Sequence, residues 1–144
     1  MVEGIGVLAD ETKGEYFMSK KRIEESVYQN AIVLLDEKGY ISPVELLVKM
    51  DRLKSKEVED WRFKRIPCLE RVIAGNLGKV NHILQTLKKF AGEQNLKPSI
   101  TVYKSWGKGP KKLLRFSKTG NADLEKLYST HYVRKKSNED EGAS

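Results

Sequence analysis

The segment from Leu77 to Ala91 constrains the fold more than any other part of this chain. Its stripe of apolar residues is too wide for a helix that stands alone in water, so it has to be buried against other elements. We therefore predict a central core helix over residues 77–91, with Asn76 able to cap its start. The stripe recurs at helical spacing and consists of Leu77, Val80, Ile83, Leu84, Leu87, Phe90 and Ala91.

Three further helices are expected on either side of this core helix. The first runs from Ser19 to about Lys38, with Ile23, Val27, Ala31 and Leu34 on one face and Gly39 at its end. Short helices are expected from Pro67 to about Ala74 and from about Ala122 to Tyr128. Residues 1–18 and 134–144 offer little apolar surface, which predicts a flexible N-terminus, a disordered tail and a single domain over residues 19–133.

A pair of short helices is expected between Ser42 and Pro67. Ser42 can cap the first, which has Pro43 at its first position and Glu45 to complete a capping box. Residues 51–54 can turn the chain, and Ser55 can cap a second helix over residues 56–64. That helix has to stop before Pro67, because the residue before a proline is pushed out of helical geometry.

The pattern changes after Gly92 from helical to β-type. Ile100, Val102 and Tyr103 form a β-branched and aromatic run, and Leu113, Leu114 and Phe116 form a second one. The turn-rich segment GKGPKK at residues 107–112 separates them. The sequence thus predicts a two-stranded β-hairpin with a long basic tip.

The segment from Val48 to Pro67 resembles the phage-repressor-like helix-turn-helix family, with Leu53, Val58 and Trp61 at matching positions and Arg52 where the family has its turn glycine. With the hairpin, this resemblance implies a mainly α, winged-helix-like fold of about five helices plus a C-terminal two-stranded β-hairpin. Three other runs are similar to those of a group of small uncharacterised bacterial proteins, a resemblance that implies no activity: DWRF-x-R-x-P-x-LE at 60–70, LLRFSK at 113–118 and THYV at 130–133.

Positive charge is concentrated in one part of the chain, whose formal net charge is +7 overall. Residues 71–118 hold eleven basic residues and a single acidic one, Glu93, so the rest of the chain is net negative. Such a concentrated positive field is typical of proteins that bind polyanions. The alternative is a solvated lysine surface without a ligand.

The basic hairpin is the candidate DNA- or RNA-binding site. Its cations can neutralise phosphates, and an exposed aromatic ring can stack on a base. The alternative is that its aromatic residues pack on the core helix. In contrast, carboxylates at the start of the second short helix, Glu57, Glu59 and Asp60, would face phosphates and argue against major-groove reading by that helix. The candidate nucleic-acid-binding residues are Lys104, Trp106, Lys108, Lys111, Lys112, Arg115 and Lys118, extended by Lys88 and Lys89 on the core helix.

Other functional classes lack support in the sequence. No nucleophile has a base at a diagnostic spacing, so we expect no enzyme. Cys68 and two distant histidines make no metal set, and Gly4–Ala9 matches a dinucleotide fingerprint by letters alone, so no metal or cofactor is expected. The chain lacks a signal-peptide pattern and an apolar run of about 18 residues, which predicts a cytoplasmic protein without membrane contact. A protein-interaction module docking through residues 43–65 remains the alternative function.

Overall fold

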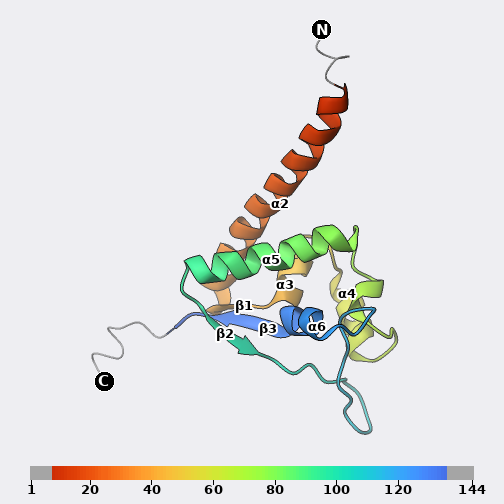
Figure 1. Ribbon diagram of the computed structural model, residues 1–144. Helices are drawn as coiled ribbons and strands as arrows, with labels where there is room; N and C mark the ends of the chain where they lie inside the picture. Colours follow the sequence, from red (N-terminus) through yellow and green to blue (C-terminus); the bar gives the residue numbers. More distant parts are fainter. Residues whose placement is uncertain (1–7, 136–144) are drawn as a thin grey trace, which may run out of the picture.

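The computed structural model describes residues 8–135, with side chains described from Lys20 onward. This part of the chain is mainly helical and carries a small antiparallel sheet (Figure 1). Of the ends predicted to be flexible, 1–18 and 134–144, residues 1–7 and 136–144 lie outside the described residues. The elements are α2 (Leu8–Lys38), β1 (Tyr40–Ile41), α3 (Pro43–Lys49), α4 (Ser55–Arg62), the 3₁₀ turn η1 (Leu69–Arg71), α5 (Leu77–Glu93), β2 (Lys97–Ile100), α6 (Ala122–Ser129) and β3 (Thr130–Val133).

The helix α5 is the central core helix that its apolar stripe predicts. Asn76 caps it by accepting a hydrogen bond from the amide of Lys79 at 2.8 Å. Leu77 is the one member of the predicted stripe that is exposed. The others are buried in the hydrophobic core, where α5 packs against the helix α2: Val80, Ile83, Leu84, Leu87, Phe90 and Ala91.

The long helix α2 begins at Leu8, so the prediction that it starts at Ser19 is wrong. Its first turns project away from the rest of the molecule in Figure 1. The predicted inward face is confirmed: Ile23, Val27, Ala31 and Leu34 are all buried. Side-chain contacts with α5 include a T-shaped pair of the Tyr28 and Phe90 rings, with centroids 5.0 Å apart.

The two short helices α3 and α4 are both present. Ser42 caps α3 by accepting the amide hydrogen of Glu45, with Pro43 at the first helical position. Asp51 makes the turn between the helices in the left-handed conformation (φ 62°). The predicted cap at Ser55 is wrong: Lys54 occupies the N-cap position, and the Glu57 carboxylate accepts its amide hydrogen at 2.9 Å. The helix predicted over 67–74 is shortened to the 3₁₀ turn η1.

The sheet differs from the predicted hairpin. The strand β3 lies in the middle and pairs antiparallel with both β1 and β2. Residues 101–116 form no strand pair, only an isolated bridge between Lys104 and Leu113. The predicted two-stranded hairpin is therefore not confirmed, and the strand pairing gives no support to the winged-helix-like arrangement. The strand β2 instead forms its hydrogen bonds with β3, a strand about thirty residues away in the sequence, and not with residues across the adjacent turn.

Candidate nucleic-acid interface

Residues 101–118, here called the basic loop, start from the outer edge of the sheet and reach the end of α4 (Figure 1). The amide of Trp106 donates a hydrogen bond to the carbonyl oxygen of Arg62 at 2.7 Å. In return, the Arg62 guanidinium donates to the carbonyl oxygen of Lys104 at 3.1 Å. These two reciprocal bonds fix the outgoing limb of the loop on the C-terminal end of α4.

The returning limb is fixed by hydrogen bonds to two carboxyl groups, of which that of Glu70 is buried and that of Glu125 is partly exposed. Glu125 accepts the amide hydrogens of Phe116 and Ser117 at 3.0 and 2.6 Å. Glu70 accepts from the amide of Lys118 at 2.7 Å and from the hydroxyl of Tyr128 at 2.8 Å. Hydrogen bonds to ionised acceptors are stronger than neutral ones, so these carboxylates hold the limb in one conformation.

The aromatic residues of the loop divide between core and surface. Phe116 is buried and packs on the rings of Trp61 and Tyr128. Trp106, in contrast, is 45% exposed and meets the 39% exposed Phe63 edge-on at 5.6 Å. Phe116 is thus buried, as the alternative expects, but its ring contacts lie on α4 and α6 rather than on the core helix, and Trp106 is not buried.

Arg62 organises this exposed aromatic surface. Its guanidinium carbon lies 4.7 Å from the ring centroid of Trp106 and 5.0 Å from that of Tyr103. A cation in this position is attracted by the electron-rich ring faces. Partial burial lowers the pKa of Arg62 below its ordinary value, and the nearby Tyr103 opposes that shift. The indole ring is therefore held in place while part of it stays open to solvent.

The tip of the loop presents backbone and lysines to solvent. Gly107 and Gly109 both adopt positive φ angles, 101° and 91°, which other residues rarely do. The ammonium group of Lys111 folds back on the carbonyl oxygen of Gly107 at 2.8 Å. The ion pairs found among residues 20–135 do not involve any of the five exposed loop lysines: Lys104, Lys108, Lys111, Lys112 and Lys118.

Arg115 and Lys118 lie apart from the tip, beside Arg71, which was not among the predicted site residues. Together with Arg71 and the segment Pro67–Cys68 they line a hollow of about 530 Å³. The Arg115 side chain also donates to the carbonyl oxygens of Ser117 and Lys118. Arg71 escaped notice because it is distant in sequence, although it belongs to the same basic segment.

The predicted extension by Lys88 and Lys89 is not contiguous with the basic loop. Lys88 lines a hollow between α5, the sheet and α6, and Lys89 lines another between α5 and α2. The helix α5 lies well away from the loop tip in Figure 1. Arg62 and Phe63 are the residues that instead complete the aromatic surface, and they were missed because they lie some forty residues before the loop.

Two of the three carboxylates of α4 are engaged within the protein. Glu57 accepts the amide of Lys54, and Asp60 lies 3.0 Å from Lys56 and 2.8 Å from Arg65. The hydrogen bonds from Arg65 and Lys56 lower the pKa of Asp60. These contacts offset part of the repulsion that the acidic helix would exert on an approaching polyanion.

Comparisons with known proteins add no assignment. No protein-family model, curated protein or solved structure matches the chain. In the part that the structure describes, there is no cluster of three or more histidine, cysteine or carboxylate residues able to hold a metal ion. Residues 8–135 also include no helix that is long and hydrophobic enough to cross a membrane.

Proposed function

We propose that this protein binds nucleic acid, without catalysis, through the tip of the basic loop and the exposed ring of Trp106. The observation that carries the proposal is the combination of a 45% exposed indole ring with four lysines, Lys104, Lys108, Lys111 and Lys112, that make no ion pair among the described side chains. Lysines attract phosphates regardless of sequence, and an open aromatic face can stack on a base.

Single-stranded nucleic acid fits this surface best. An unpaired base can leave its neighbours and stack on Trp106, whereas the bases of a duplex are already stacked on each other. The backbone at Gly107 and Gly109 has no side chain to hold a phosphate chain at a distance. Lys88 and Lys89 are left out of the proposed contact, because α5 does not adjoin the loop tip.

The test is fluorescence anisotropy with mixed-sequence single-stranded DNA, single-stranded RNA and duplex DNA over a range of salt concentrations. We expect binding to weaken steeply with salt, because bound lysines release counterions from the phosphates. Changing Lys108, Lys111 and Lys112 together to Ala should leave the fold intact and make the salt slope shallower by about one unit per lost contact.

A matched control removes the same charge elsewhere. Lys21, Lys49 and Lys89 are exposed and lie on α2, α3 and α5. Their joint change to Ala should leave most of the affinity and the slope in place. Equal losses in the two triple variants would show an unspecific charge effect, and no binding by the wild type at low salt would overturn the proposal.

The competing hypothesis is a protein partner that docks on the α3–α4 pair. A hollow of about 410 Å³ lies between these helices and α2, lined in part by Val44, Val48 and Val58. Under this hypothesis, Val48→Asp would abolish capture of the partner, while the triple lysine variant would have no effect on it. Nucleic-acid binding with the expected salt slope would favour the loop over this surface.

A further inference from the structure

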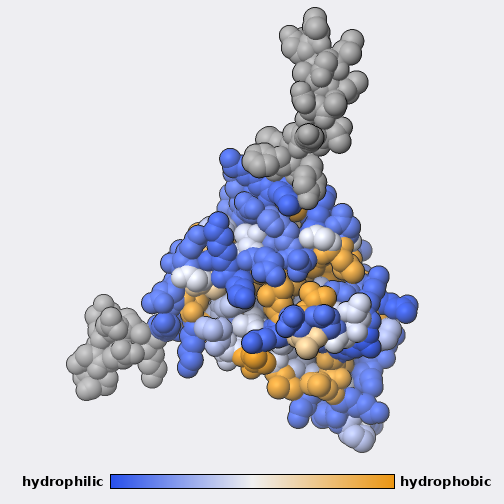
Figure 2. Space-filling model, in the orientation of Figure 1, coloured by the Kyte–Doolittle hydropathy of each residue, from blue (hydrophilic) through white to orange (hydrophobic). Residues whose placement is uncertain are grey.

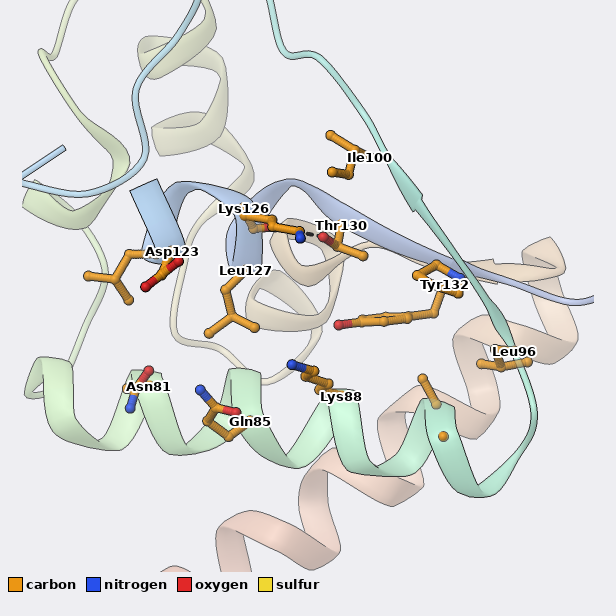
Figure 3. A pocket seen from close by; sticks show the side chains of 14 residues that line it. Asn81, Gln85, Lys88, Leu96, Ile100, Asp123, Lys126, Leu127, Thr130 and Tyr132 are labelled. Atoms are coloured by element: carbon orange, nitrogen blue, oxygen red, sulfur yellow. Dashed lines mark hydrogen bonds between the residues drawn. The ribbon is translucent and has the colours of Figure 1, made fainter. Parts of the chain in front are cut away.

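The hollow that Lys88 lines is separate from the basic loop and lies between α5 on one side and β2, β3 and α6 on the other (Figure 3). Its volume is about 850 Å³, which is within the range of pockets that hold small molecules. Figure 2 shows hydrophobic surface in the middle of this face of the molecule, surrounded by hydrophilic residues. The proposed nucleic-acid interface does not use this hollow.

The walls of the hollow are mainly apolar. Leu127 points from α6 toward α5, and Leu96 closes the end near the start of β2 (Figure 3). Ile100, on the outer strand, is 58% exposed, so apolar surface here is left open to water. An apolar chain placed in the hollow would remove this surface from water, which is favourable in proportion to the apolar area buried.

Tyr132 supplies a polar group inside this apolar space. The residue is only 5% exposed, and its ring points from β3 into the hollow (Figure 3). Its hydroxyl makes none of the hydrogen bonds found among residues 20–135, unlike the hydroxyls of Tyr28, Tyr103 and Tyr128. Burial raises the pKa of Tyr132, so the hydroxyl keeps its proton at neutral pH and remains available to donate.

The charged side chains that line the hollow are unequal in number. Lys88, on α5, lines the hollow together with Tyr132, and both side chains reach into the space between α5 and β3 (Figure 3). Lys126 and Asp123, both on α6, are the other titratable side chains among the lining residues besides Tyr132. Two cations against one acid favour an anion, while the carboxylate of Asp123 would repel a doubly charged group more than a singly charged one.

We propose that this hollow binds a small amphipathic monocarboxylate. The carboxylate accepts hydrogen bonds from the Tyr132 hydroxyl and the Lys88 ammonium group, and the apolar tail lies against Leu96 and Leu127. This arrangement satisfies the free hydroxyl and covers the exposed apolar wall at once. It stands independently of nucleic-acid binding by the basic loop.

The experiment is an NMR titration of the ¹⁵N-labelled full chain with octanoate, and in parallel with 1-octanol, which has the same chain length and no charge. We expect saturable shifts of amide signals in α5, β3 and α6 with octanoate, and binding of 1-octanol that is weaker by about tenfold. Absence of saturable octanoate binding, or equal affinities for the two probes, would overturn the proposal.

Two neighbouring lysines provide the matched variants. Lys88→Gln should weaken octanoate binding by about tenfold and leave 1-octanol binding unchanged, since only the charged contact is lost. Lys89→Gln removes the same charge from the adjacent residue, which lines the hollow on the α2 side, and should change neither. Equal effects of the two changes would exclude Lys88 as the carboxylate partner.

Tyr132→Phe tests the hydroxyl. We expect it to weaken octanoate binding several-fold while the melting temperature stays close to that of the wild type, because the hydroxyl has no partner within the described protein to lose. A large drop in the melting temperature with unchanged octanoate affinity would assign the hydroxyl to the fold rather than to a ligand. The Lys88 variant decides the proposal in that event, because that residue is exposed.

Discussion

The indole Nε1 of Trp61 donates a hydrogen bond to the main-chain carbonyl oxygen of Arg115 at 2.7 Å. Trp61 is the last but one residue of α4 and is completely buried, whereas Arg115 lies on the returning limb of the basic loop. The bond therefore joins the helical pair to the proposed nucleic-acid interface. It also means that the position of the loop depends on a core residue of another element.

Trp61→Phe removes this donor while keeping an aromatic ring in the core. The Arg115 carbonyl would retain only the longer bond from the amide of Leu69, at 3.3 Å. Loss of the bond and the space left by the smaller ring should lower the free energy of unfolding by about 1–3 kcal/mol. Urea unfolding measures the change, with the partly exposed Trp106→Phe as the control. An unchanged midpoint for Trp61→Phe would show that the bond contributes little.

The core prediction concerns α5. Leu84 and Leu87 are 1% and 0% exposed, so changing either to Ala leaves a cavity in the centre of the helical core. We expect a loss of about 2–5 kcal/mol in the free energy of unfolding for each variant. Leu77→Ala on the same helix is the matched control, since Leu77 is 37% exposed and should cost far less. Similar losses for all three would contradict the conclusion that burial sets the cost, because Ala is at least as good a helix former as Leu.

The sequence predicted most of the helices, because their signals are local. The cap at Asn76 and the apolar stripe after it define α5 within a few residues, and Ser42 with Pro43 does the same for α3. The start of α2 at Leu8 was missed because residues 8–18 have no clear apolar period. For such a segment, continuity with a helix that is already packed outweighs the weak local pattern.

The sheet could not be predicted in the same way, because its pairing is distant in sequence. The partner of Lys97–Ile100 is Thr130–Val133, and the four-residue strands are too short to show a reliable alternation. The candidate site shows the same limit: the loop lysines and Trp106 are visible in the sequence, but the support by Arg62 and Phe63 appears only when α4 is brought to the loop.

His131 makes the stability of the fold dependent on pH. Its Nε2 lies 2.7 Å from the Tyr103 hydroxyl, and its ring stacks on Tyr40. Burial lowers the pKa of His131 below its ordinary value of 6.5, an effect that the nearby Glu45 partly opposes. The unfolded chain therefore binds a proton more readily than the folded one, so stability is fully present above about pH 6.5 and is lost as pH falls toward the folded-state value.

Thermal melting between about pH 7.5 and 5.5 measures this dependence. We expect the melting temperature of the wild type to fall with pH, and His131→Gln to make the decrease shallower. His82→Gln changes the other histidine of the chain and should leave the part of the pH dependence that comes from His131 unchanged. If the decrease in melting temperature is the same for His131→Gln as for the wild type, the histidine has no part in it.

Trp106→Ala separates stacking on a ligand from packing within the loop. The main-chain bond from residue 106 to Arg62 survives the change, and the lost ring is 45% exposed, so the melting temperature should fall only slightly. Affinity for single-stranded oligonucleotides should nevertheless fall by about 1–3 kcal/mol, the usual contribution of one stacked base. Leu113→Ala is the control, because Leu113 is a 74% exposed apolar residue of the same loop that cannot stack.

If both variants lose affinity equally, the loop binds through its apolar surface and not through base stacking. If Trp106→Ala loses affinity only in proportion to a large loss of stability, the ring serves to position the lysines, and the phosphate contacts alone carry the binding.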